Sequence, residues 1–318
     1  MALIVGIICI YIAYQSNNNT LYSYSGNAYG TTWSIKSNSF ISDKHLNEIK
    51  KIITKVDFIA SNYKNDSEVA FLNFSDINRE IFVSDDLYYL IDKANQLSIE
   101  TNNVYNITLG MISGNYGFSP TFDKDLSNAT YENRFILNKT NKSITKLNDF
   151  WFDLSSIAKG YAVDLIYEYL LQNDFTNFFI EIGGEMFISG LNNNNKWNIG
   201  ISNPENPLEP IVTLPLTNVA IATSGEYMNF YYSNNKVISH TLNSNTGEPI
   251  NNKSTSVTVI NSNSTTDADA LATALNAMPF EKALDFSNNN NLSVMFIIKT
   301  LDSSEIVYSD SWYDLIND

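Results

Sequence analysis

The segment DADALATAL contains the residues best suited to bind a cation. Asp269 and Thr273 are four residues apart in a segment with helical spacing, so their side chains should share one face of the helix. Carboxylate and hydroxyl oxygens are ligands that hard divalent cations prefer. The pair is therefore a candidate cation site. The competing interpretation is that Asp267 or Asp269 caps the helix and Thr273 is a half-buried core residue.

His240 is the candidate for proton transfer. It lies in VISHTLNSNTGEPI, between a strand-like run and a turn rich in Asn and Gly. An imidazole changes its charge near neutral pH and can act as a general base. A lone histidine is also commonly a hydrogen-bonded structural residue, and both roles stay open at this point.

Two further segments could contact phosphate groups. The backbone amides of Gly183-Gly184-Glu185 could donate hydrogen bonds to an anion, or the two glycines could simply form a tight turn after a strand. Lys159, at the start of a helical segment, could meet a phosphate with help from the helix dipole. The alternative for Lys159 is an ordinary solvated lysine.

These residues must be positioned by long helices and runs of neighbouring strands. Apolar residues recur at helical spacing in several segments, and shorter apolar or alternating runs indicate strands. The predicted helices are Asp43 to Tyr63, Asp85 to Thr101, Ser156 to Gln172, Asp267 to Met278 and Glu281 to Ser287. The predicted strands are FFIEI before Gly183, Trp197 to Ile201, Val212 to Leu216, Ala220 to Thr223, Phe230 to Tyr232, Val257 to Ile260, and a hairpin of Leu292 to Lys299 with Glu305 to Tyr308. This order favours an α+β fold over alternating βαβ units.

Composition excludes several classes of protein. The chain has 318 residues, 44% of them hydrophobic, which is enough for a sizeable core and excludes disorder as the main state. Its net charge of −15 is spread along the sequence, which argues against nucleic acid as a partner. A phosphate-bearing substrate would therefore need a metal ion. One cysteine and two histidines exclude a disulfide framework, a thiolate zinc site and a multi-histidine metal centre.

The first residues are predicted to direct the protein to the cell envelope. Ala2 to Tyr14 is an apolar run of the length of a signal-peptide core or a short anchor. Cys9 lies inside this run after Ile7 and Ile8, so we interpret it as an apolar residue and not as a lipid attachment site. We therefore expect a signal or anchor segment with a linker over residues 1–20, and one domain over residues 21–318 on the periplasmic face of the inner membrane, anchored or secreted.

Nine segments occur together in a recognisable order, and with them the chain resembles the ApbE-type flavin transferases. These enzymes move FMN from FAD onto a hydroxyl of a target protein. The resemblance extends from about Tyr29 to about Ser287. Its segments are AYGTTWSIK, VDFIASNYKNDSEVAFLN, TNNVYNITLG with NYGFSP, FDLSSIAKGYAVD, IEIGGEMFISG, WNIGISNP, IATSGEY, SHTLNSNTGEPI, and SVTVI with DADALATAL.

The resemblance implies a T-fold-like domain with mixed, largely antiparallel sheets and packed helices, and it assigns site residues. The FAD-binding positions are Tyr29, Tyr63, Val104, Tyr105, Asn106, Asp153, Lys159 and Leu242. Magnesium is assigned to the Ser156 backbone carbonyl and the side chains of Asp269 and Thr273. His240 is then the candidate base that removes the acceptor proton, a role that Asp269 could share.

At four places the sequence differs from the family pattern by lacking an acidic residue or the residue that makes a turn rigid. Asn106 replaces an aspartate, Asn102-Asn103 replaces an acidic-Gly pair, and Asn243-Ser244 replaces Asp-Pro. Ala272 stands where some members have a further acidic metal ligand, so a second metal ion is less expected. We expect these changes to affect catalytic rate more than FAD binding, since the Asn106 amide can still form hydrogen bonds.

The implied activity is magnesium-dependent transfer of FMN from FAD to a Ser or Thr hydroxyl of an acceptor flavoprotein, with release of AMP. The implied acceptors are flavin-carrying subunits or domains of membrane redox complexes. Two alternatives stay open. One is an FAD pyrophosphatase that gives FMN and AMP, and the other is a non-catalytic FAD-binding protein of the envelope. The sequence does not separate transfer from hydrolysis, because the two differ only in the acceptor that reaches phosphorus.

Overall fold

The computed structural model describes residues 20–206, 208–225, 230–233, 236–250, 254–299 and 303–317. The predicted signal or anchor run from Ala2 to Tyr14 lies outside these residues. Among the helices within these ranges, none combines the length and the apolar character needed to cross a membrane.

An eight-stranded sheet forms the centre of the molecule, and each pair of neighbouring strands in it is antiparallel. In spatial order its strands are β1 (Tyr22–Ala28), β2 (Thr31–Ser37), β6 (Phe178–Ile182), β7 (Glu185–Ser189), β10 (Val219–Gly225), β13 (Ser254–Asn261), β14 (Ser293–Lys299) and β15 (Ser304–Tyr308). The predicted α+β class with largely antiparallel pairing is confirmed.

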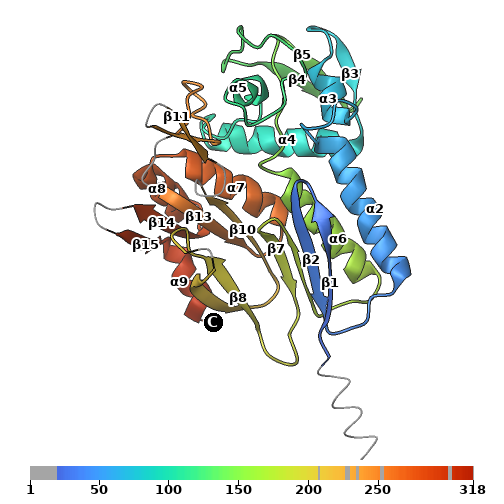
Figure 1. Cartoon of the computed structure of the whole chain (residues 1–318), viewed down its shortest axis with the longest axis vertical. Coiled ribbons are helices and arrows are strands. Elements are labelled where there is room, and N and C mark those ends of the chain that lie inside the picture. Colours follow the sequence, from blue (N-terminus) through green and yellow to red (C-terminus); the bar gives the residue numbers. More distant parts are fainter. Residues whose placement is uncertain are drawn as a thin grey trace, which may run out of the picture.

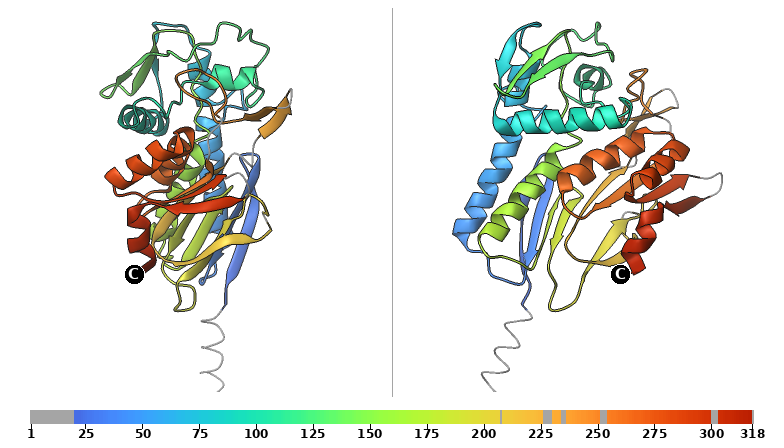
Figure 2. Two further views of the ribbon diagram at one scale, coloured as in Figure 1. Left: turned by 90° about the vertical axis from the view of Figure 1, so that its left-hand side faces the viewer. Right: turned by 180° about the vertical axis from the view of Figure 1, so that it is seen from behind.

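The sheet is covered on both faces, because its strands alternate apolar side chains between two cores. Ile180 and Phe187 face the helical side, whereas Ile188 joins the opposite core with Trp197 and Trp312. The helical layer is α2 (Asp43–Ala60), α6 (Ala158–Gln172), α7 (Thr265–Ala277) and α8 (Phe280–Asn289), and the rear view in Figure 2 looks onto it. The other face is covered by β8 (Trp197–Ser202), β9 (Pro210–Leu216) and α9 (Asp310–Asn317).

The chain between α2 and α6 builds a smaller lobe at one end of the sheet. Its elements are α3 (Glu68–Asn73), β3 (Glu80–Phe82), α4 (Asp85–Glu100), α5 (Gly110–Asn115), β4 (Phe135–Asn138) and β5 (Ser143–Lys146). Figure 1 shows α4 crossing over the end of the helical layer, with the short strands of the lobe beyond it. A separate hairpin of β11 (Phe230–Ser233) and β12 (Lys236–Ser239) precedes His240.

Helix α7 lies between the two lobes, and its alanines permit this position. Ala268 and Ala272 belong to the core against the large sheet, while Ala270 and Ala274 belong to the core of the smaller lobe. Alanine favours the helix and lets neighbouring elements approach closely on both sides. The segment DADALATAL is therefore held from two sides, which fixes the direction of its polar side chains.

Candidate active site

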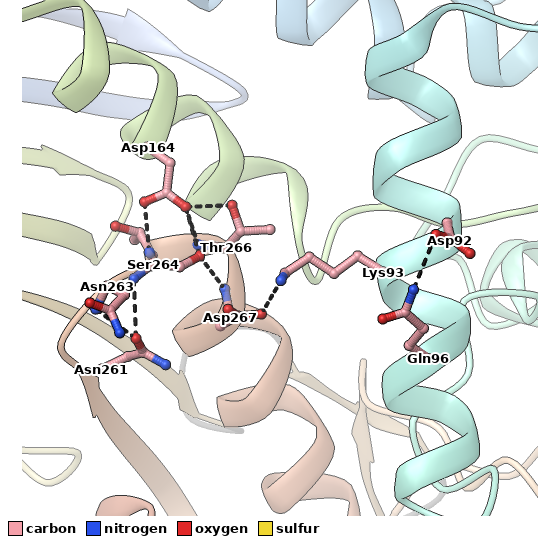
Figure 3. Close-up of polar contacts among 10 residues, drawn as sticks. Asp92, Lys93, Gln96, Asp164, Asn261, Asn263, Ser264, Thr266 and Asp267 are labelled. Carbon is pink, nitrogen blue, oxygen red and sulfur yellow. Dashed lines mark hydrogen bonds and ion pairs between the residues drawn. The ribbon is translucent and has the colours of Figure 1, made fainter. Parts of the chain in front are cut away.

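The start of α7 is fixed by a carboxylate from α6. Asp164 accepts hydrogen bonds from the backbone nitrogens of Thr265 (2.7 Å) and Thr266 (2.9 Å), and from the hydroxyls of Ser264 (2.9 Å) and Thr266 (2.6 Å). Figure 3 shows its carboxylate directed at Ser264 and Thr266. Ser264 is itself the N-cap, because its Oγ accepts from the Asp267 nitrogen at 3.1 Å. Neither Asp267 nor Asp269 is the cap that the competing interpretation required, and α7 begins two residues before its predicted start.

Asp267 instead links the two lobes. Its Oδ1 lies 2.6 Å from Nζ of Lys93 on α4, and Figure 3 shows this ion pair spanning the space between the two helices. The hydrogen bonds of Asp164 and the Lys93 ion pair therefore hold the first turn of α7 against both α6 and α4.

Asp269 is buried at a close contact between α6 and α7. The residue is only 4% exposed, and its Oδ2 accepts a hydrogen bond from the Gly160 nitrogen at 3.0 Å. A Cβ on Gly160 would collide with the Thr265 carbonyl and would come within 2.9 Å of the Asp269 Cβ, so the close approach requires glycine here. Burial raises the pKa of Asp269, and the Lys159 ammonium opposes this rise.

Lys159 lies between two carboxylates and is not the ordinary solvated lysine of the alternative reading. Its Nζ is 3.0 Å from Glu185 Oε1 and 3.9 Å from Asp269 Oδ1. Burial disfavours the ammonium, but the charges of Asp269 and Glu185 outweigh this effect and raise the pKa of Lys159. Its side chain remains 27% exposed, so an anionic ligand can reach it.

The Glu185 side chain, for which no role is predicted from the sequence, is the partner of Lys159. Glu185 is 2% exposed and begins β7 directly after the Gly183-Gly184 turn. Burial acts to raise the pKa of Glu185, and the Lys159 ammonium 3.0 Å away opposes this rise by favouring the carboxylate. No pattern in the sequence signals this pairing, because the two residues lie on different elements.

The Gly183-Gly184 turn does not offer its amides to a phosphate. The Gly183 nitrogen donates to the Thr32 carbonyl at 3.1 Å, and the Gly184 nitrogen donates to Glu181 Oε1 at 2.9 Å. Both glycines have positive φ, +62° and +106°, which is the conformation that glycine adopts easily. The simple turn is therefore the correct reading.

Tyr105, Ser156 and Asp153 lie beside the end of α7 that carries Asp269. The Tyr105 hydroxyl is 2.8 Å from Ser156 Oγ. Burial, Asp269 and Asp153 all act to raise the pKa of Tyr105 above its usual value, which places both carboxylates within electrostatic reach of it. The structure thus brings together these three predicted residues and Asp269.

The remaining residues of the predicted FAD segment take different positions. Val104 packs against the core under the large sheet. Asn106 Oδ1 accepts hydrogen bonds from the Thr108 nitrogen (2.9 Å) and the Thr108 hydroxyl (2.7 Å). The Asn106 amide nitrogen is consequently the group that faces a ligand, if one contacts this side chain.

Tyr63 and His240 are connected through Phe118. Tyr63 is 67% exposed, and its hydroxyl donates to the Phe118 carbonyl at 2.8 Å. The Phe118 ring lies edge-on to His240, with ring centroids 6.2 Å apart. Leu242 is buried against Leu109 and the neighbouring apolar residues of the small lobe. His240 therefore lies on the side of the molecule where Tyr63 offers an open aromatic surface.

Tyr29 lies in the β1–β2 turn, next to the Gly183 turn. Its φ is +52°, and its hydroxyl donates to the Ile53 carbonyl on α2 at 2.9 Å. Thr31, two residues later, is the side chain that a Cβ on Gly183 would meet, at 2.7 Å. Tyr29 is thus near the Lys159 end of the site, with its hydroxyl already paired.

The donor set suits a magnesium ion whose coordination is completed by substrate phosphates. Within the part of the chain that the structure describes, no three His, Cys, Asp or Glu side chains are grouped to hold a metal. The candidate donors are the Asp269 carboxylate, the half-buried Thr273 hydroxyl one turn later, and the Ser156 carbonyl. Magnesium is commonly bound by one or two carboxylates together with phosphates. Among the residues that the structure describes, the contact found for Asp269 Oδ1 is the Lys159 ammonium at 3.9 Å, which is longer than a hydrogen bond.

Comparison with known proteins decides the family. The family model described as "ApbE family" matches residues 29–296, which is most of the chain. The chain belongs to the ApbE family. The resemblance identified from the sequence is thereby confirmed.

Relatives in the ApbE family cover nearly the whole chain. The FAD:protein FMN transferase of Haemophilus influenzae is 32% identical over 324 aligned residues, 94% of this chain and 93% of that protein. The protein of the same name from Vibrio cholerae is 32% identical over 308 residues, 91% of this chain and 90% of that protein. The solved structure "Flavin Transferase ApbE from Vibrio cholerae" superposes with a TM-score of 0.83 at 29% identity, covering 93% of this chain and 99% of that one. This ApbE-family chain is an enzyme, as its curated relatives are.

Proposed function

We propose that this ApbE-family enzyme is a magnesium-dependent FAD:protein FMN transferase. The observation that carries the proposal is the Asp269 carboxylate, held against the Gly160 amide beside the reachable Lys159 ammonium. A single carboxylate with an adjacent cation suits a pyrophosphate substrate with its metal ion, because the ion offsets the repulsion between the phosphates and a protein with a net charge of −15.

Different residues would bind the metal ion, the phosphates and the flavin ring. Asp269, Thr273 and the Ser156 carbonyl would hold the ion, and Lys159 would pair with a phosphate oxygen. The aromatic rings of Tyr29 and Tyr63 offer stacking surface for the flavin. When bound, magnesium neutralises phosphate charge and stabilises AMP as the leaving group.

The transfer step forms one bond and breaks one. The hydroxyl oxygen of a Ser or Thr in the acceptor attacks the phosphorus of the FMN half, and the bond from that phosphorus to the bridging oxygen breaks. The electron pair leaves with AMP, and His240 takes the hydroxyl proton as general base. The acceptors that we propose are flavin-carrying subunits or domains of membrane redox complexes.

The test is incubation of residues 20–318 with FAD, magnesium and a candidate acceptor. We expect saturable quenching of FAD fluorescence, AMP release, and a mass increase of one FMN on the acceptor. AMP release equal with and without acceptor, and no labelling, would identify an FAD pyrophosphatase instead. Saturable FAD binding without AMP would identify a binding protein, and no saturable binding would refute a flavin substrate.

We also propose that the domain acts outside the cytoplasm, because Ala2 to Tyr14 is apolar and has the length of a signal or anchor core. Alkaline phosphatase, which needs an oxidising compartment to form its disulfides, is joined after Asn19. The fusion should be active in cells, whereas the same fusion without residues 2–14 should be inactive. Equal activity of the two fusions would contradict the proposed location.

A further inference from the structure

Glu185 is a buried carboxylate that the fold alone does not require. It begins β7 on the side of the sheet that faces the helical core, where Phe187 is apolar. Its Oε1 pairs with Lys159 at 3.0 Å, whereas its Oε2 is buried and accepts no hydrogen bond from the residues that the structure describes. A buried carboxylate with half of its lone pairs unused is costly. An apolar residue at position 185 would stabilise the fold more than a glutamate does. The glutamate therefore indicates a functional role for this position.

Lys159 has two possible carboxylate partners, and the structure shows which one it takes. Nζ is 3.0 Å from Glu185 and 3.9 Å from Asp269. The lysine stem passes over the glycine turn, since its Cδ lies 3.4 Å from where a Cβ of Gly183 would stand. The absence of a side chain at Gly183 therefore leaves room for the lysine stem.

A neutral residue at position 185 would change which carboxylate pairs with Lys159. An ammonium and a carboxylate about 4 Å apart in a partly buried site attract each other appreciably, and Nζ is already 3.9 Å from Asp269 Oδ1. With Asp269 as the one remaining carboxylate partner of the pair, the ammonium would move onto Asp269 Oδ1. It would then occupy the oxygen that the proposed metal site needs.

We propose that Glu185 is a positioning residue that holds the Lys159 ammonium away from Asp269 and so keeps Asp269 Oδ1 available to the metal ion. Held by Glu185, the ammonium would not compete with a bound ion for Asp269 Oδ1 and would remain available to pair with a phosphate oxygen. This inference rests on the proposed function, specifically on Asp269 as a metal ligand.

The experiment measures binding of Mn²⁺ alone, as a paramagnetic substitute for magnesium, from the electron paramagnetic resonance signal of the free ion. We expect Glu185→Gln to weaken Mn²⁺ binding about tenfold, well within the attraction available. Glu185→Asp, which keeps the charge, should stay within a few-fold of wild type. Glu181→Gln is the matched control, since Glu181 lies on β6 across the same turn, and it should bind Mn²⁺ as wild type does.

Two further variants separate the role of Glu185 from the assignment of Asp269 as a metal ligand. The double variant Glu185→Gln/Lys159→Met lacks the competing ammonium and should bind Mn²⁺ as wild type does. A crystal structure of Glu185→Gln alone should show Lys159 Nζ in contact with Asp269. Wild-type Mn²⁺ affinity in Glu185→Gln, alongside a loss in Asp269→Asn, overturns the role of Glu185 alone. Unchanged affinity in Asp269→Asn overturns the metal site and the inference together. Thermal unfolding checks that each variant is folded. Should Glu185→Gln fail to fold, Glu185→Met takes its place, since an apolar side chain suits this buried position and also lacks the charge, and the same tenfold weakening is expected.

Discussion

Asp269→Asn is expected to lower FMN transfer by about a thousandfold or more while the domain remains folded. The substitution removes the only charged group among the three proposed magnesium ligands, and metal stabilisation of developing charge contributes several kcal/mol to such reactions. Asparagine keeps an oxygen that can still accept the hydrogen bond from the Gly160 nitrogen. We choose asparagine because Asp269→Ala would leave the buried Gly160 nitrogen without an acceptor, at a cost of about 1–3 kcal/mol in stability.

The measurement is the rate of acceptor labelling, followed by protein mass, with AMP release and thermal unfolding recorded on the same samples. Asp267→Asn is the matched control, because it changes a carboxylate on the same helix whose contact is the Lys93 ion pair. We expect it to lower stability slightly and to leave transfer near wild type. Chelation of wild type by EDTA should reproduce the Asp269→Asn result. Wild-type transfer in Asp269→Asn would show that the metal assignment is wrong.

His240→Asn is expected to lower the single-turnover rate of transfer about a hundredfold or more with little change in FAD affinity. A serine or threonine hydroxyl has a pKa far above neutral, so its attack needs a positioned base, which typically contributes 10²–10⁴ in rate. Asparagine retains a hydrogen-bonding group of similar reach and lacks the titratable nitrogen.

The other histidine is the natural control. His45 on α2 lies with its Nδ1 2.8 Å from the Tyr169 hydroxyl, among structural contacts of the helical layer, so His45→Asn should transfer FMN at nearly the wild-type rate. Single-turnover rates and FAD fluorescence titrations are measured for both variants. A large loss of FAD affinity in His240→Asn with an unchanged single-turnover rate would make His240 a binding residue and leave deprotonation to Asp269 or solvent.

The asparagine replacements noted in the sequence preserve backbone geometry. Asn102 and Asn103 both have positive φ, +52° and +62°, a region that asparagine tolerates better than most residues. In the turn after His240, Asn243 Oδ1 accepts from the Asn245 nitrogen at 2.9 Å, which stabilises the turn without proline. These departures therefore remove charge but keep the turns.

The long helices could be predicted from the sequence because their signal is local. The pattern over Asp85 to Thr101 matches α4, Asp85–Glu100, almost residue for residue, since apolar side chains three and four apart lie on one face. The strands β1 and β2 were not predicted. The sequence YSYSGNA of β1 alternates small polar residues with tyrosines, and this weak pattern becomes a strand through pairing with β2.

Spacing also predicted that Asp269 and Thr273 share a helix face, but the arrangement around them depends on tertiary structure. Asp164 reaches Ser264 across 100 residues of sequence, and Gly160 reaches Asp269 across 109. Such contacts arise only when α6 packs against α7 and the β6–β7 hairpin lies beneath them, which no local period encodes. The sequence by itself therefore determined the family, the long helices and the candidate ligands, whereas the short helices α3, α5 and α9 were not predicted. Packing decided that Lys159 pairs with Glu185, that the Gly183-Gly184 amides bond within the protein, and that Ser264 and Asp164, not Asp269, cap α7.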